Sequence, residues 1–198
     1  YNRAAMEKFY AYLDRMKFIK RWQLMRSTRE ENIMEHSHQV AVLTHALAVI
    51  ENKVYGGNVN VERAVLYALY HEVSEVMTGD MPTPVKYFNR QLHGEYAKVE
   101  QLAVDRIAAT LPEPMQEELY PYLQAEKDCE EYVFVKAADK LSAYLKCLEE
   151  LRSGNSEFIQ AKRTIEDALH EKHMRSVEYF FEHFIPAFEL TLDELEGL

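Results

Sequence analysis

The sequence predicts an all-α fold, a single globular domain resembling a helical bundle. Apolar residues recur at helical spacing along several long segments, and almost no stretch alternates with the period of two that is typical of a half-buried strand. Only six glycines and six prolines occur among 198 residues, whereas the helix-favouring Glu, Lys, Leu and Ala are abundant. No repeat or Gly-, Ser- or Pro-rich linker divides the chain, so residues 1–198 are expected to form one domain.

Caps and helix breakers predict where each helix begins and ends. Gly56 and Gly57 end a central, buried helix, and Gly79 ends the next one. Pro82 and Pro84 should prevent a helix from resuming directly after Gly79. In chain order, the expected helices cover residues 3–18, 33–54, 60–77, 94–111, a short segment after Pro114, 130–152, a segment capped by Asn155, and a final turn whose capping box is Thr191 and Glu194.

Charge and composition exclude several classes of partner. The 33 acidic and 23 basic residues give a net charge of −10 with no clustered basic surface, so a nucleic-acid polymer is not an expected partner. No apolar run approaches the roughly 20 residues that span a bilayer, and the charged N-terminus does not resemble a signal peptide. Cys129 and Cys147 form no C-x-x-C motif and are expected to be reduced thiols, which favours a cytoplasmic protein without membrane association.

Metal-binding residue types interrupt three helices that otherwise look buried. His36 opens the helix at 33–54, His71 and Glu72 are expected in the middle of the helix at 60–77, and Asp139 lies within the helix at 130–152. Buried carboxylates are unfavourable unless they are paired or bound to a metal. Two imidazoles and two carboxylates suit one divalent transition metal ion, so these four residues are the predicted metal ligands of a hydrolytic site.

Two further carboxylates are candidates for proton transfer. Glu75 lies four residues after His71, which would place both side chains on one helix face. Glu75 is therefore expected to orient the attacking water or take its proton without binding the metal. Asp80 follows the end of the same helix, where a loop residue can reach the same cleft, and the sequence does not rank the two.

Each of these residues also has a simpler interpretation when it is taken alone. Asp139 could form an ion pair with Lys136 or Lys140, and His45 is more typical of a core histidine than of a ligand. The other histidines are interpreted as structural or surface residues: His38, His93, His170, His173 and His183. The ordered set of His, His-carboxylate and Asp on three successive long helices is much more specific than any one member.

Five local strings carry a resemblance to a known family. They are RWQLMR at 21–26, EHSHQVA at 35–41, GGNVN at 56–60, TGDMPTPVKYFN at 78–89 and KAADKLSAYLKCLEEL at 136–151. Together with the order His, His-carboxylate, Asp, they resemble the bacterial 5′-deoxynucleotidases, a branch of the HD-domain metal-dependent phosphohydrolases. The resemblance covers nearly the whole chain.

The resemblance implies a fold, a reaction and a set of roles. It implies an all-helical homodimer that hydrolyses deoxyribonucleoside 5′-monophosphates to deoxynucleoside and phosphate with one divalent metal ion, with cobalt or manganese expected to serve in vitro. It implies that Arg21 orients the phosphate and that Trp22 lies at the sugar. The residues implied to line the nucleotide site are Arg21, Trp22, His36, Asp80, Met81, Pro82, Thr83 and Asp139.

The chemistry of Arg21 and Trp22 agrees with these roles. A guanidinium is a rigid fork that suits phosphate oxygens. An indole at the sugar edge can exclude a 2′-hydroxyl by shape, although apolar exclusion of a hydroxyl is typically worth only about 10²-fold. Without the resemblance, a capping Arg21 and a core Trp22 would be the simpler interpretation.

One position departs from the family pattern, and other functions compete with the nucleotidase. The family's second histidine is followed by Asp, whereas here it is followed by Glu72, whose side chain is one methylene longer. An altered metal preference or a looser metal affinity is therefore expected.

The competing hypotheses for the function are another HD-type reaction (cleavage of a pyrophosphate or cyclic phosphodiester bond), a degenerate HD domain that binds nucleotide without turnover, and a purely structural helical protein.

Overall fold

The structure, a computed structural model, describes residues 6–86, 88–124 and 129–197. Within these ranges the elements are helices, and the only β-type pairing is one isolated antiparallel bridge between Lys20 and Asn32. The predicted all-α class is therefore confirmed. Contacts divide the chain into a first unit (Tyr1–Met25, Glu30–His38 and Leu69–Glu126) and a second unit (Arg26–Arg29, Gln39–Ala68 and Lys127–Leu198). The expectation of one domain stays a prediction.

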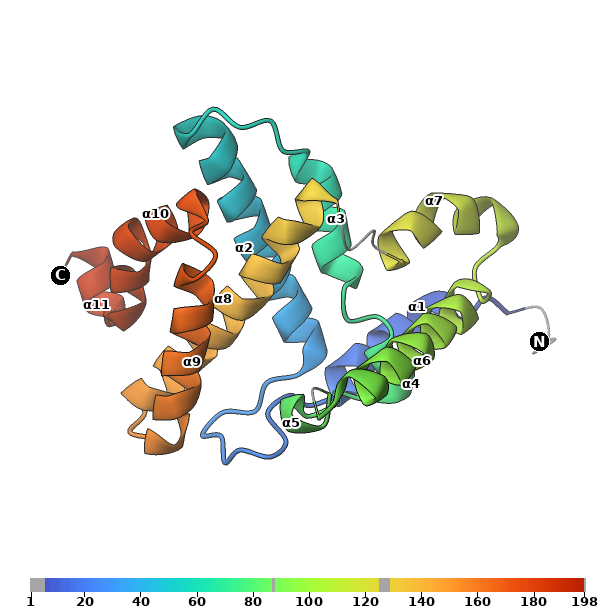
Figure 1. The fold of residues 1–198 in the computed structure, drawn as a ribbon, viewed down its shortest axis with the longest axis horizontal. Helices are drawn as coiled ribbons and strands as arrows, with labels where there is room; N and C mark the ends of the chain where they lie inside the picture. The colour runs from blue at the N-terminus through green and yellow to red at the C-terminus, as the bar shows by residue number, and fades with distance from the viewer. Residues whose placement is uncertain (1–5, 87, 125–128, 198) are drawn as a thin grey trace. The chain divides into compact units, whose positions relative to one another are not determined.

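The first unit packs several helices around α6 (Figure 1). Helices α1, α4, α5 and α7 all contact α6. Their shared core consists of Phe9, Val73, Val104, Ile107, Ala108, Leu111 and Leu123. The elements of this unit are α1 (Phe9–Asp14), the 3₁₀ helix η2 (Arg15–Phe18), the first residues of α2 (Ile33–Val54), α4 (Glu75–Thr78), α5 (Thr83–Lys86), α6 (Arg90–Ala108) and α7 (Glu113–Leu123).

Several N-terminal boundaries differ from the prediction. The helix expected at 3–18 is the short α1 followed by η2, and residues 1–5 lie outside the described residues. Helix α6 begins four residues earlier than predicted because the side chain of Asn89 caps it, accepting a hydrogen bond from the Leu92 N–H at 2.7 Å. A one-turn helix, α5, does form after Gly79; Pro84 is tolerated in it because the first turn needs no backbone N–H from that residue.

The helix predicted at 60–77 is broken in the structure. Helix α3 (Val61–Tyr70) ends before His71, residues 71–74 form turns, and α4 then begins at Glu75. The Val73 N–H donates to the Tyr70 carbonyl and the Glu75 N–H to the Glu72 carbonyl, both at 3.0 Å, so these turns are tighter than an α-helix. The break lets the consecutive residues 73–75 all become buried, which one face of a straight helix cannot do. Tertiary packing therefore overrides the helical pattern.

The second unit agrees more closely with the prediction. Helices α2 and α8 have the predicted bounds, and the capping box of Thr191 and Glu194 is present. His45, interpreted as a core histidine, is instead exposed on α2. Helix α8 packs against α9 (Figure 1). The elements of this unit are the remainder of α2, α3, α8 (Glu130–Arg152), η3 (Ser156–Phe158), α9 (Ile159–His170), α10 (Arg175–His183), η4 (Ile185–Glu189) and α11 (Leu192–Glu196).

A buried carboxylate in the second unit holds the segment 26–29. Glu150 is fully buried on α8 and accepts hydrogen bonds from the Thr28 N–H and hydroxyl, each at 2.8 Å. It also accepts from Lys146 Nζ at 2.5 Å and from Asn155 Nδ2 at 2.9 Å. A fifth hydrogen bond comes from the Arg29 N–H at 3.2 Å, so the segment is fixed against α8 and its C-terminal turn.

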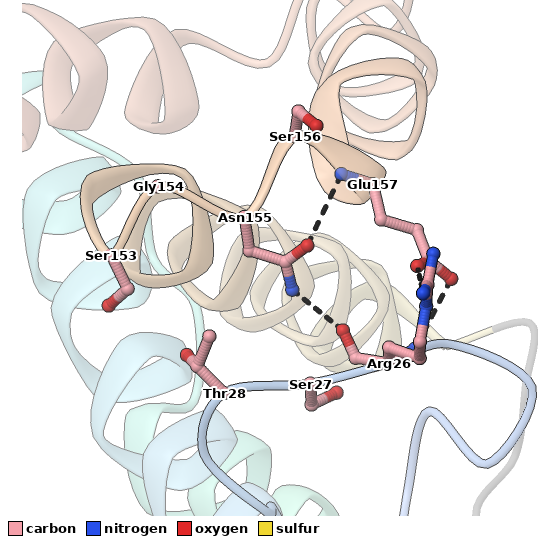
Figure 2. A pocket seen from close by; sticks show the side chains of 8 residues that line it. All are labelled: Arg26, Ser27, Thr28, Ser153, Gly154, Asn155, Ser156 and Glu157. Atoms are coloured by element: carbon pink, nitrogen blue, oxygen red, sulfur yellow. Dashed lines mark hydrogen bonds and ion pairs between the residues drawn. The ribbon is translucent and has the colours of Figure 1, made fainter.

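A pocket of about 590 Å³ lies beside this anchor (Figure 2). Asn155 and Glu157 reach across it to Arg26: Asn155 Nδ2 donates to the Arg26 carbonyl at 2.6 Å, and Arg26 Nε donates to Glu157 at 3.0 Å. Three of the polar residues that line the pocket, Arg26, Asn155 and Glu157, therefore bind one another, and the described lining residues include none of the predicted site residues. Among the described helices, none has the length and apolarity to cross a membrane.

Candidate active site

Three of the four predicted metal ligands lie together in the first unit. Asn32 caps α2 by accepting hydrogen bonds from the Met34 and Glu35 N–H groups, both at 3.0 Å, and His36 follows in the first turn, fully buried. The rings of His36 and His71 have centroids 5.4 Å apart. Glu72 Oε1 lies 3.3 Å from His71 Nε2, and one ligand atom from each of the three residues lies within 4.8 Å of the others.

This donor set fits a divalent metal ion. Two imidazole nitrogens and a carboxylate oxygen are ligands of first-row divalent metals, and their close approach suits a common ion. Oε1 of Glu72 lies beside the imidazole of the neighbouring His71. Asp139, the fourth predicted ligand, lies half-buried on α8 in the second unit.

Glu75 occupies the first position of α4 and is buried beside Glu72. Burial first, and then the neighbouring Glu72, with which it shares a hydrogen bond, raise the pKa of Glu75 to about 11. The sequence predicted that Glu75 shares a helix face with His71; this is wrong, because the helix is interrupted between them. The tight turns bring Glu75 next to Glu72 instead.

Asp80 follows Gly79 in the connection between α4 and α5. Burial raises the pKa of Asp80, the positive charge of Arg21 lowers it, and the negative charge of Glu72 raises it again. Asp80 is therefore influenced by the charges of both Glu72, the predicted metal ligand, and Arg21, the predicted phosphate-binding residue. Of the other predicted nucleotide-site residues, Met81 and Pro82 follow directly and are half-buried, and Thr83 opens α5.

Arg21 and Trp22 are held by an antiparallel pairing with the segment before α2. The Arg21 N–H donates to the Glu31 carbonyl at 2.9 Å, and the Ile33 N–H donates to the Ile19 carbonyl at 3.0 Å. The Arg21 guanidinium lies against the metal-ligand group, with Nη1 donating to His36 Nδ1 at 2.8 Å. Trp22 has a φ of 61°, a left-handed conformation that costs a bulky residue about 1–3 kcal/mol.

The sequence analysis missed two charged residues of this site. Glu31 binds the side chains of both Arg21 and Trp22, at 2.9 and 2.8 Å. Lys86, on α5, donates to Glu100 at 3.0 Å and lies 5.4 Å from the centre of the Tyr96 ring. Burial would lower the pKa of Lys86, but Glu100, Glu72 and Glu75 together raise it above its usual value. The only available signal for Lys86 was its position inside one of the family-like strings; Glu31 had none.

The fold is similar to that of HD-domain phosphohydrolases of known structure. The fold is that of an HD-domain phosphohydrolase from Listeria innocua, which has a TM-score of 0.81 at 24% identity, with 96% of this chain and 92% of that chain covered. It is also similar to a cyanophage S-2L HD phosphohydrolase, DatZ, with a TM-score of 0.63 at 23% identity, covering 89% and 95% of the two chains. That structure holds dA and one catalytic Zn²⁺ ion.

The sequence identifies the family within this class. A family model described as 5′-deoxynucleotidase YfbR-like matches residues 8–188. A 5′-deoxynucleotidase of Vibrio cholerae is 52% identical over 188 residues, covering 94% of this chain and 97% of the relative. The 5′-deoxynucleotidase YfbR of Escherichia coli is 51% identical over 189 residues, covering 94% of each. The chain belongs to the YfbR-like 5′-deoxynucleotidase family, which confirms the resemblance seen in the sequence.

Proposed function

We propose that this chain is a metal-dependent 5′-deoxynucleotidase that hydrolyses deoxyribonucleoside 5′-monophosphates to deoxynucleoside and phosphate. The relatives that carry this name match almost the full chain at about half identity. The observation that supports the chemistry is the group of His36, His71 and Glu72 with the Arg21 guanidinium beside it, because the group suits a metal and the guanidinium suits a phosphate.

Four side chains make up the proposed ligand set. His36, His71 and Glu72 supply it from the first unit, and Asp139 of α8 is proposed as the fourth ligand on the strength of the family pattern. A bound divalent ion, with cobalt or manganese proposed to serve in vitro, lowers the pKa of water and offsets charge on the phosphoryl oxygens.

Glu75 and Asp80 are proposed to move the protons. Glu75 is proposed to take a proton from the attacking water. Its hydrogen bond with Glu72, a proposed ligand, supports this role. Asp80, whose pKa burial raises, is proposed to pass a proton to the 5′-oxygen of the leaving nucleoside.

Arg21 is proposed to exchange partners when the site is loaded. A guanidinium can only donate, so Nδ1 of His36 accepts the hydrogen bond from Arg21 in the structure. A neutral imidazole has a single nitrogen lone pair, so His36 cannot bind a metal through Nε2 while Nδ1 accepts this bond. The hydrogen bond from Arg21 to His36 is therefore exchanged for one to the substrate phosphate, while the bond from Arg21 to Glu31 is kept. Trp22 and the residues Asp80, Met81, Pro82 and Thr83 surround the nucleoside.

Phosphate release from matched substrates tests the function. Purified protein is incubated with deoxyribonucleoside and ribonucleoside 5′-monophosphates, with and without added cobalt or manganese. Metal-dependent release of phosphate, faster from the deoxyribonucleotides, is expected. Nucleotide binding without phosphate release by metal-loaded protein would indicate a degenerate domain. Cleavage of only pyrophosphate or cyclic phosphodiester substrates would indicate another HD-type reaction.

A further inference from the structure

A single carboxylate oxygen binds both side chains that are proposed to contact the nucleotide. Oε2 of Glu31 accepts from Arg21 Nη1 at 2.9 Å and from Trp22 Nε1 at 2.8 Å. We propose that Glu31 is a positioning residue that sets the orientation of the phosphate-binding Arg21 and of the sugar-binding Trp22 together. This inference rests on the proposed function, because it assigns Glu31 a role in that same site.

The Glu31 carboxylate is well placed to fix the two side chains. Its side chain is 12% exposed and that of Arg21 is 15% exposed, so water competes weakly for their ion pair. The backbone pairing between Arg21 and Glu31 holds the carboxylate opposite its partners. The guanidinium also stacks near the indole, with Arg21 Cζ 5.7 Å from the centre of the Trp22 ring. The three side chains therefore form one rigid group.

This bonding pattern defines what Arg21 can offer a phosphate. Both N–H groups of Nη1 are engaged, one by Glu31 and one by His36. When His36 is released, the bond to Glu31 remains and keeps the plane of the guanidinium fixed. An arginine fixed in this way loses little conformational entropy on binding a phosphate bidentately, which favours both binding and in-line orientation.

The same carboxylate supports an unfavourable conformation at Trp22. A bulky residue at a φ of 61° needs compensation from its surroundings, and the bond from Nε1 to Glu31 supplies part of it. The φ of Trp22 and the bond to Glu31 together determine where the indole lies. If the indole discriminates against a 2′-hydroxyl by shape, loss of Glu31 has to weaken that discrimination without altering the indole itself.

The experiment compares Glu31→Ala and Glu31→Gln with Glu30→Ala as the matched control. Glu30 is the adjacent carboxylate on the same segment, is 74% exposed, and pairs with Lys20 rather than with the site. Trp22 is the single tryptophan of the chain, so intrinsic fluorescence reports on its position without any assay of activity. Glu31→Ala is expected to shift the emission and increase acrylamide quenching, whereas Glu30→Ala leaves both unchanged.

The kinetic expectation separates positioning from a purely structural role. Glu31→Ala should raise KM for deoxyribonucleotides about tenfold and move the deoxy-to-ribo ratio of kcat/KM towards that of Trp22→Ala. Glu31→Gln, whose amide oxygen can still accept both bonds, should restore the emission and most of the ratio. In an Arg21→Ala background, Glu31→Ala should no longer raise KM.

Two results would overturn the inference. One is a folded Glu31→Ala protein, judged by circular dichroism, with the emission and the deoxy-to-ribo ratio of the parent. The other is a Glu31→Gln protein that is as impaired as Glu31→Ala in both readouts. If the alanine variant does not fold, a folded Glu31→Gln protein that lacks the emission and the deoxy-to-ribo ratio of the parent overturns the inference. A parent protein that releases no phosphate would refute the proposed function instead, and the fluorescence comparison would still show whether Glu31 holds Trp22.

Discussion

At the scale of single residues, the protonation of Glu75 depends strongly on its surroundings. Its pKa of about 11 arises from burial and from the adjacent Glu72, so the group is neutral around pH 7 in the absence of a cation. A positive charge held at Glu72 favours ionisation of Glu75, which is the form that accepts a proton. Under the proposed mechanism, metal loading is therefore expected to favour the proton-accepting form of Glu75.

Glu75→Gln should retain the metal and the fold but lose about 10²–10⁴-fold in kcat, because the amide cannot accept the proton. The measurement is phosphate release at saturating deoxynucleotide together with metal content per chain. Glu95→Gln on α6, an exposed carboxylate paired with Lys98, serves as the control and should behave as the parent. Loss of the metal along with activity would instead make Glu75 a ligand.

Glu72 is the second residue whose role can be isolated by substitution. Glu72→Asp should preserve hydrolysis, because the shorter carboxylate restores the family residue, and Glu72→Ala should weaken metal binding severely because it removes a ligand. Metal affinity measured by calorimetry distinguishes the two variants. Unchanged metal occupancy and rate in Glu72→Ala would leave His36, His71 and Asp139 as the ligands.

At the scale of elements, Gly79 ends α4 and turns the chain into the segment that carries Asp80. Gly79 has a φ of 72°, and a Cβ added there would meet no atom within 4 Å, so only backbone strain opposes a larger residue. With a ψ of 168°, Gly79 lies in a region that is essentially restricted to glycine, so Gly79→Ala should destabilise the protein by about 1–3 kcal/mol. Gly94→Ala, in α6 with equal space around it, should instead stabilise by about 1 kcal/mol. Thermal unfolding measures both, and effects of the same sign would contradict this account.

A second prediction at this scale concerns the anchor between α8 and the segment 26–29. Removing the Glu150 charge leaves Lys146 buried without its counter-ion, so Glu150→Gln should cost about 3–5 kcal/mol in the free energy of unfolding at pH 7. Glu95→Gln is the control: its exposed pair with Lys98 should contribute less than about 1 kcal/mol. Urea unfolding gives both values.

The pH dependence of this effect follows from the depressed pKa of Glu150. Burial acts to raise this pKa, but the hydrogen bonds from Lys146, Thr28 and Asn155 outweigh it and hold the pKa below the ordinary value of 4.5. A carboxyl group with a lowered folded-state pKa stabilises the protein above its unfolded-state pKa and loses that contribution as the pH falls. The difference between the parent and Glu150→Gln should therefore shrink below about pH 4.5, and a difference that grows on acidification would contradict the ion pair.

At the scale of the whole molecule, the family resemblance predicts a homodimer. The C-terminal elements carry exposed apolar side chains, including Phe184, Phe188, Leu192 and Leu195, which are compatible with a protein interface. Light scattering should give twice the chain mass of 23.3 kDa at micromolar concentration. A mass equal to that of one chain under the same conditions would refute the dimer.

The sequence by itself determined the helical class and the approximate bounds of α2 and α8. It also singled out His36, His71 and Glu72, which the structure brings close together and whose role as metal ligands stays a prediction. These features depend on local signals, namely apolar periodicity, caps and glycines, and on the distinctive order of the ligands along the chain. Tertiary structure decided the break at residues 71–74, because the tight turns place Val73 in the core of the first unit and bury the adjacent Ser74 and Glu75. Tertiary structure also decided the positions of Glu31 and Lys86. Each contacts a residue that is ten or more positions away along the chain, and no local sequence pattern predicts which distant segments pack together.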